Sequence, residues 1–205
     1  MPPFSICIGR QLASGGRAVG QRLARRLGAT YYDREVLDLA ARESGMSREV
    51  FERSDERRGF FSTAVRSMGS FVGMNGLYTH DSRDLRIFEL QADAIRAAAG
   101  REDCIFIGRA ADYILRELPR LLTVFICADE EERISNLLAG SQGEPAPCST
   151  PEEARRMMER VDAKRAAFYN FYSNKVWGAA ASYDLCINVT RTGLDGAVDI
   201  IAKAL

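Results

Sequence analysis

"GRQLASGGRAVG", residues 9–20, is a glycine-rich stretch that connects two different patterns. The apolar run FSICI precedes it at residues 4–8, and QRLARRLG follows at residues 21–28 with helical spacing of its apolar residues. Phosphate-binding loops have this order of strand, glycine-rich turn and helix, because the N–H groups at a helix start attract anions. The stretch therefore predicts an α/β fold with an anion site after its first strand.

The rest of the chain alternates in the same way. Apolar runs typical of buried strands lie at 4–8, 30–32, 104–107, 122–127 and 185–189. Helical patterns lie at 16–27, 34–44, 83–99, 109–117, 130–139, 151–172 and 194–204. Thr150 is expected to cap the long helix, with Glu153 in capping-box position. Alternating strands and helices favour a parallel sheet, with ligands along the edge where the strands end.

Composition narrows the function classes. The 205 residues include 28 Lys and Arg against 28 Asp and Glu, so no net field favours nucleic acid or a membrane surface. The five cysteines have no metal-site spacing, and four of them lie in the strand-like runs. We predict no metal ligands among them, no membrane span, and a cytoplasmic protein.

The glycine-rich stretch resembles a Walker A loop, GxxxxGK[ST], in two registers. In one register Arg17 replaces the lysine and Ala18 the Ser/Thr, and in the other Gly16 stands in the lysine place. In both registers the hydroxyl that would hold Mg²⁺ is missing. Residues Ser14, Gly15, Gly16, Arg17 and Ala18 are our predicted ATP-binding residues, with Arg17 supplying charge. A tight turn without a ligand explains the glycines as well.

Polar residues follow the later strands. Asp33 comes after the second strand, and Gly108, Arg109 and Asp112 come after the third, so all four are expected at the ligand edge. A helix cap is the alternative for Asp33.

The long helix at 151–172 carries a second group of polar residues. Asp162, Arg165 and Tyr169 are spaced to share one of its faces, and three further arginines lie nearer its start: Arg155, Arg156 and Arg160. A solvated ion pair and ordinary core packing are the alternatives for Asp162–Arg165 and for Tyr169. Trp177 either stacks on a base or packs where the chain returns to the last strand, and a catalytic role for His80 is disfavoured.

In their order along the chain, these motifs resemble the cytidylate kinase-like proteins. The segments SGGR, YYDRE, IGRAADYIL and AKRAAFYNFYSNKVWG, with YDLCIN after them, carry the resemblance, which extends from about residue 5 to 203. It implies a P-loop nucleoside monophosphate kinase: a five-stranded parallel sheet in the order 2-3-1-4-5 between helices. It also implies one domain, with a core of about 1–54, 81–139 and 183–205, a monophosphate-binding insert at 55–80 and a lid at 140–182.

The resemblance also implies roles. Asp33 and Arg109 match residues on the acceptor side, and Asp162 and Arg165 match an Asp-x-x-Arg pair that faces cytosine. With Asp112 they form our predicted substrate site, and Arg155, Arg156 and Arg160 are predicted lid arginines. Arg17, Arg109 and Arg165 are the predicted catalytic residues. The family's Mg²⁺ and ATP would be the cofactors.

The predicted function is phosphoryl transfer from ATP to CMP or dCMP. Two alternatives stay open: a kinase for another small acceptor, and a catalytically weak nucleotide-binding regulatory protein. The only partners expected are small nucleotides, and the sequence leaves homo-oligomer formation undecided.

Overall fold

The structure is a computed structural model that describes residues 2–33, 82–140 and 148–205. The chain divides into two compact units, residues 1–34 with 95–205 and residues 35–94. Helix α4 (Ser82–Ala99) belongs to the second unit up to residue 94. The helix predicted at 34–44, the insert at 55–80 and His80 lie outside the described residues.

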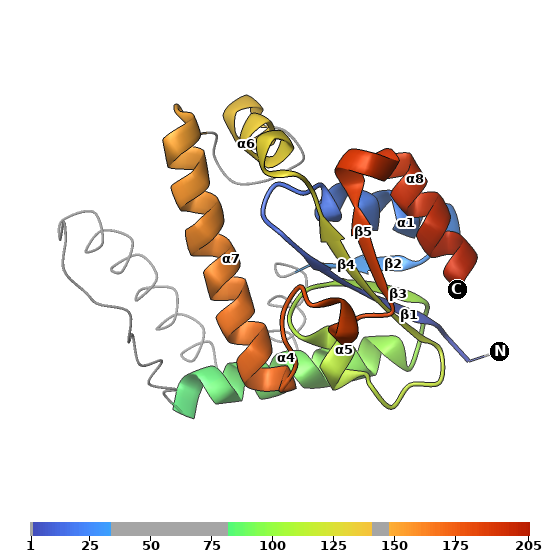
Figure 1. Cartoon of the computed structure of the whole chain (residues 1–205). Coiled ribbons are helices and arrows are strands. Elements are labelled where there is room, and N and C mark those ends of the chain that lie inside the picture. Colours follow the sequence, from blue (N-terminus) through green and yellow to red (C-terminus); the bar gives the residue numbers. More distant parts are fainter. Residues whose placement is uncertain (1, 34–81, 141–147) are drawn as a thin grey trace. The chain divides into compact units, whose positions relative to one another are not determined.

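The first unit contains the predicted sheet. Its strands are β1 (Ser5–Arg10), β2 (Thr30–Tyr32), β3 (Cys104–Ile107), β4 (Leu121–Cys127) and β5 (Leu185–Asn188). All neighbours pair in parallel in the order β2-β3-β1-β4-β5, which confirms the predicted topology. Their C-terminal ends therefore lie along one edge, as Figure 1 shows.

The helices follow the predicted patterns, with two differences. Their bounds are α1 (Gly16–Leu27), α5 (Ala111–Ile114), α6 (Glu130–Ala139), α7 (Pro151–Ser173) and α8 (Val189–Ala204), with a short 3₁₀ turn η1 (Ala180–Ser182). Helix α5 starts later than predicted because Arg109 and Ala110 have left-handed backbones, with φ of 63° and 51°, and it ends at Ile114, before the predicted end at 117. Helix α8 begins before residue 194 and is kinked at Gly193.

Thr150 caps α7 as predicted. Its Oγ1 accepts from the N–H of Glu153 at 3.2 Å. The Glu153 carboxylate accepts from the N–H of Ser149 at 2.8 Å, one residue before the position that a capping box uses. Two side chains therefore fix the start of the helix that carries five of the predicted site residues.

The main core fills one face of the sheet. Helices α1 and α8 cover this face (Figure 1), where Val19 and Leu23 of α1 pack with Ile8 of β1 and Ile201 of α8, all 0% exposed. The opposite face carries α5. Four cysteines lie in strands as predicted, and all five are free thiols. In the described ranges, no helix has both the length and the apolar character needed to cross a membrane.

Candidate active site

The glycine-rich loop connects β1 to α1 at the C-terminal edge of the sheet. Gly15 has a left-handed backbone, with φ of 78°, and immediately precedes α1, whose first residue is Gly16. No side chain caps this helix end, and its first turn contains no acidic residue. The first N–H groups of α1 therefore resemble those that bind anions in other proteins.

The structure separates the two loop registers. A left-handed glycine immediately before the helix suits the second glycine of the motif, which puts Gly16 in the lysine place and Arg17 in the Ser/Thr place. Arg10, the last residue of β1, then stands in the place of the first glycine. Compared with the Walker A motif, an arginine (Arg10) therefore replaces the first glycine, and a glycine (Gly16) replaces the lysine.

Helices α6 and α7 hold the loop through buried polar bonds. Asp162 Oδ1 accepts from the N–H of Leu12 at 2.8 Å, and Asp162 Oδ2 pairs with Arg133. Arg133 Nε donates to the Leu12 carbonyl at 2.8 Å, and the Asn136 amide donates to the Ala13 carbonyl at 3.0 Å. Because the Arg133 and Asp162 side chains are only 9% and 14% exposed, these bonds fix the loop firmly.

Arg165 lies beside this cluster. Its Nη1 donates to the Arg10 carbonyl at 3.1 Å and lies 3.7 Å from Asp162 Oδ1. The structure therefore brings two predicted substrate residues, Asp162 and Arg165, to the glycine-rich loop. Both oxygens of Asp162 are engaged there, and base recognition by this pair stays a prediction.

Arg10 crosses the loop through space that two glycines leave open. A Cβ atom at Gly16 would lie 2.6 Å from Arg10 Cβ and 3.0 Å from Arg10 Cγ. A Cβ atom at Gly108 would lie 2.4 Å from Arg10 Nη1. The side chain thus starts beside Gly16 and carries its guanidinium to Gly108, at the end of β3.

The turn after β3 is strained. Gly108, Arg109 and Ala110 have consecutive left-handed backbones, with φ of 73°, 63° and 51°. Such a conformation costs non-glycine residues about 1–3 kcal/mol each and is concentrated at functional sites. Arg109 Cζ lies 5.4 Å from the centre of the Phe168 ring of α7. The turn thereby places Arg109 at the same sheet edge as the loop, as predicted.

Asp112 lies in the interior, below this edge. Its Oδ2 accepts from the Tyr169 hydroxyl at 2.6 Å, and the residue is 6% exposed. Burial raises the pKa of Asp112 above its usual value, while the bond from Tyr169 and the charge of Lys175 act in the opposite direction. Burial, followed by the bond to Asp112, raises the pKa of Tyr169 as well. This is a structural pair, and a substrate contact for Asp112 stays a prediction.

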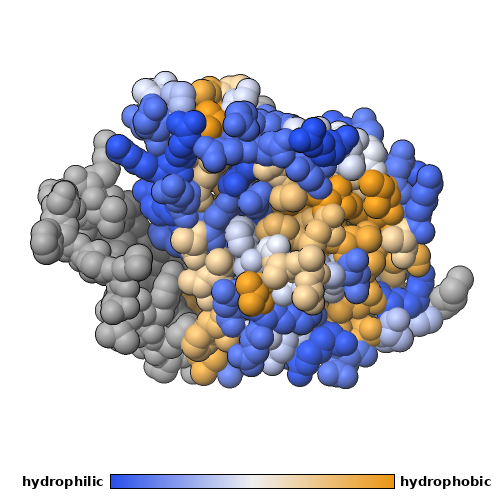
Figure 2. Space-filling model, in the orientation of Figure 1, coloured by the Kyte–Doolittle hydropathy of each residue, from blue (hydrophilic) through white to orange (hydrophobic). Residues whose placement is uncertain are grey.

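The remaining predicted residues lie on separate elements. Asp33 directly follows β2, so it is at the sheet edge that also holds Arg109. Arg155 is exposed and bonds Glu130 of α6 at 2.8 Å, and Arg156 and Arg160 are exposed along α7. Figure 2 shows hydrophilic side chains over the first turns of α7. A lid function for these three arginines stays a prediction.

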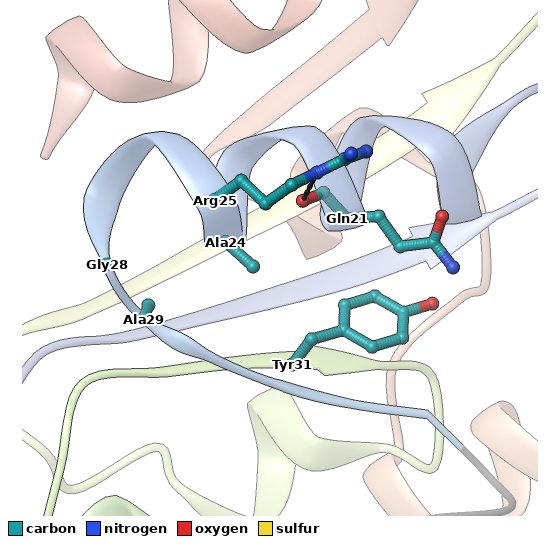
Figure 3. A pocket seen from close by; sticks show the side chains of 6 residues that line it. All are labelled: Gln21, Ala24, Arg25, Gly28, Ala29 and Tyr31. Atoms are coloured by element: carbon teal, nitrogen blue, oxygen red, sulfur yellow. Dashed lines mark hydrogen bonds between the residues drawn. The ribbon is translucent and has the colours of Figure 1, made fainter.

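Two other features lie away from the loop. A pocket against α1 and β2 is drawn in Figure 3 and is lined by Gln21, Ala24, Arg25, Gly28, Ala29 and Tyr31. None of these is a predicted site residue. Trp177 packs edge-on against Phe125 of β4, with 5.0 Å between ring centres, which favours the packing alternative for this residue.

Sequence reasoning missed three residues that hold or line the loop: Arg10, Arg133 and Asn136. Arg133 and Asn136 belong to an ordinary amphipathic pattern at 130–139, and nothing in it indicates contacts with residues 12 and 13. Arg10 had a signal, since a glycine in the lysine place leaves room for a side chain from elsewhere. In the described part of the chain, no three His, Cys, Asp or Glu residues are grouped as metal ligands would be.

The sheet order and the loop at its edge define a P-loop kinase-type fold. The sequence matches the model of the cytidylate kinase-like family over residues 5–191, and the chain belongs to that family. Among solved structures it resembles an uncharacterized protein from Eubacterium ventriosum ATCC 27560, with 25% identity, a TM-score of 0.71 and coverage of 98% of this chain and 97% of that one.

A second solved structure supports the fold alone. Shikimate kinase from Bacteroides thetaiotaomicron is 15% identical, with a TM-score of 0.55 and coverage of 98% of this chain and 97% of that one. No curated protein matches the sequence.

Proposed function

We propose that the protein transfers the γ-phosphoryl group of ATP to a nucleoside monophosphate, CMP or dCMP. The observation that carries the proposal is the glycine-rich loop, which opens into an uncapped helix at the sheet edge and is held by the Asp162–Arg133 pair. Family membership supports a phosphotransferase. The cytidine acceptor rests on the Asp-x-x-Arg match at Asp162 and Arg165.

Phosphoryl transfer needs alignment and neutralised charge more than covalent chemistry. The N–H groups of Ser14 to Ala18 would cradle the donor phosphates, and Arg17 in the first turn of α1 would add charge. Arg109, on the turn after β3, would bind the acceptor phosphate. The loop is held because α6 binds its carbonyls at Leu12 and Ala13 and Asp162 of α7 accepts from the Leu12 N–H, so the donor would be aligned at little entropic cost.

Mg²⁺ is the less well supported cofactor. Ala18 has no oxygen to offer, and the place of the Ser/Thr ligand belongs to Arg17 in the register that the helix start favours. Mg²⁺ normally keeps waters and substrate phosphates as most of its ligands. Since the described side chains do not form a ligand set for it, no step of this mechanism relies on the ion.

The loop also favours a second candidate, a nucleotide-binding protein with weak catalysis. Gly16 in the lysine place removes the point charge that P-loop enzymes direct at the β- and γ-phosphates. A protein that binds ATP without turnover would then serve regulation.

Calorimetric titration with ATP, CMP, dCMP, UMP and AMP tests the proposal, with and without Mg²⁺, followed by turnover assays. We expect ATP and one monophosphate to bind, with turnover for CMP or dCMP. Binding of ATP without turnover of any of the four monophosphates would favour the regulatory candidate or a different acceptor. The absence of any nucleotide binding would exclude both.

A further inference from the structure

We propose that Arg10 replaces the missing Walker lysine in function. It would bind the terminal phosphates of the nucleotide from the β1 end of the loop, whereas the lysine of the motif binds them from the helix end. The inference rests on the proposed function, because it adds Arg10 to the proposed ATP site. It also goes beyond the predicted set of site residues, in which Arg17 was the only loop arginine.

Positions 10 and 16 lie too close together for two long side chains. With only 2.6 Å between Arg10 Cβ and a Cβ atom at Gly16, a lysine at 16 and an arginine at 10 exclude each other. In the register set by the start of α1, these two positions are the lysine place and the first-glycine place. The cation has therefore changed position within the motif, and a glycine has taken the place it left.

The Arg10 guanidinium lies beside the turn that follows β3. Arg10 Nη1 is close enough to Gly108 that a side chain there would meet it at 2.4 Å, and Gly108 starts the turn that positions Arg109. The charged group thus lies between the glycine-rich loop and the turn with the predicted acceptor residue. A phosphoryl group in transfer from donor to acceptor would occupy this region.

The chemistry of the Arg10 guanidinium suits terminal phosphates. The base of the residue is held, since Arg165 Nη1 donates to the Arg10 carbonyl at 3.1 Å and Gly16 flanks the first side-chain carbons. A guanidinium stays charged at physiological pH and binds two phosphate oxygens as a fork, whereas an ammonium acts as a point charge. A pre-positioned fork therefore suits the β- and γ-phosphates.

Arg10→Met is the first test, because it removes the charge and keeps most of the apolar stem. We expect ATP affinity to fall roughly 10- to 100-fold, as for lost charge-assisted hydrogen bonds. Binding of AMP, which lacks both terminal phosphates, should change much less. Arg22→Met is the matched control: this exposed α1 arginine pairs with Asp195 at 2.6 Å, and its loss should leave ATP affinity unchanged.

The double variant Arg10→Gly with Gly16→Lys restores the GxxxxGK order. Gly16→Lys alone should lower both thermal stability and ATP affinity, because the new side chain meets Arg10. The double variant should bind ATP more tightly than Arg10→Gly alone. Calorimetry on the full chain, with melting temperatures for each variant, gives both readouts without an activity assay.

The outcomes are distinguishable. If the parent binds ATP and folded Arg10→Met binds it equally well, the role of Arg10 is wrong and the proposed function survives. If the folded parent binds neither ATP nor inorganic triphosphate, the proposed function fails, and the inference fails with it.

Discussion

At the scale of single residues, we expect the buried pair of Asp112 and Tyr169 to make stability depend on pH. Folding raises the pKa of Asp112, so this carboxyl loses its proton at a lower pH in the unfolded chain than in the folded one. The free energy of unfolding should therefore fall as pH rises above about 4, the usual pKa of Asp. The Tyr169 hydroxyl opposes this effect, because its hydrogen bond lowers the pKa of Asp112.

Tyr169→Phe should therefore destabilise the protein more at pH 7 than at pH 4. We expect a loss of about 1–3 kcal/mol in the free energy of unfolding at pH 7, because the buried carboxyl loses its partner. Urea titrations at both pH values measure it. Tyr113→Phe removes a hydroxyl from a half-buried ring and serves as the control. An equal loss at the two pH values would contradict the inference that the Tyr169 hydroxyl stabilises the ionised form of Asp112.

Also at this scale, substitutions of Arg109 and Arg165 should impair activity in different ways. Arg109→Ala removes a guanidinium that would bind two oxygens of the acceptor phosphate. Because all monophosphates have this phosphate, kcat/KM should fall about 100-fold for every acceptor. Arg165→Ala should reduce the preference for cytidine. A site that hydrogen-bonds one base rejects the others because they leave its buried polar groups without partners. Since Arg165 also bonds the Arg10 carbonyl, the KM for ATP is measured separately.

The comparison uses CMP, dCMP, UMP and AMP with variants that melt like the parent. Equal losses for all four monophosphates in Arg165→Ala would remove the cytidine assignment and leave the kinase proposal intact. A loss confined to one base in Arg109→Ala would contradict its role on the shared phosphate.

At the scale of elements, α6 and α7 are joined by two Arg–carboxylate pairs that differ in burial. Arg133–Asp162 is 9% and 14% exposed, whereas Arg155–Glu130 is 48% and 57% exposed. Removal of one partner from a buried pair leaves the other charge without compensation and is strongly destabilising, while exposed pairs contribute little.

Asp162→Asn should accordingly lower the free energy of unfolding by about 3 kcal/mol. Its amide oxygen can still accept from the Leu12 N–H, but Arg133 loses its counter-charge. Arg155→Ala is the matched control and should have no measurable effect on stability. Denaturant titrations give both values, and similar small effects would show that the buried pair does not hold the loop.

The elements themselves were predictable from sequence, because each depends on local patterns. The apolar runs predicted the five strands, and the helical pattern at 16–27 matches the bounds of α1, which ends where the Gly28 N–H bonds the Ala24 carbonyl. The late start of α5 was not predictable, since it depends on left-handed backbones at Arg109 and Ala110. The pairing of Arg133 with Asp162 joins residues 29 positions apart, which no local pattern encodes.

At the scale of the whole molecule, the parallel topology gathers residues from distant parts of the sequence. Arg10 ends β1, Asp33 follows β2 and Arg109 follows β3, and the three strands are neighbours that end along one edge. If the proposed function is right, donor and acceptor phosphates meet at this edge. A single ligand that joins the two nucleotides should then reach both.

A bisubstrate compound, adenosine and cytidine linked 5′ to 5′ through five phosphates, provides that test. It should bind more tightly than ATP or CMP, because the second contact costs no further loss of translational freedom. At 100 times its dissociation constant it should stabilise the fold by about 2.7 kcal/mol, a rise in melting temperature of roughly 5–10 °C. The analogue with two adenosines separates base recognition from phosphate binding, since it has the same charge. Arg109→Ala should remove most of the advantage over ATP. A compound that binds no better than ATP alone would mean that the acceptor does not lie beside the glycine-rich loop, and the nucleotide kinase proposal would then be wrong.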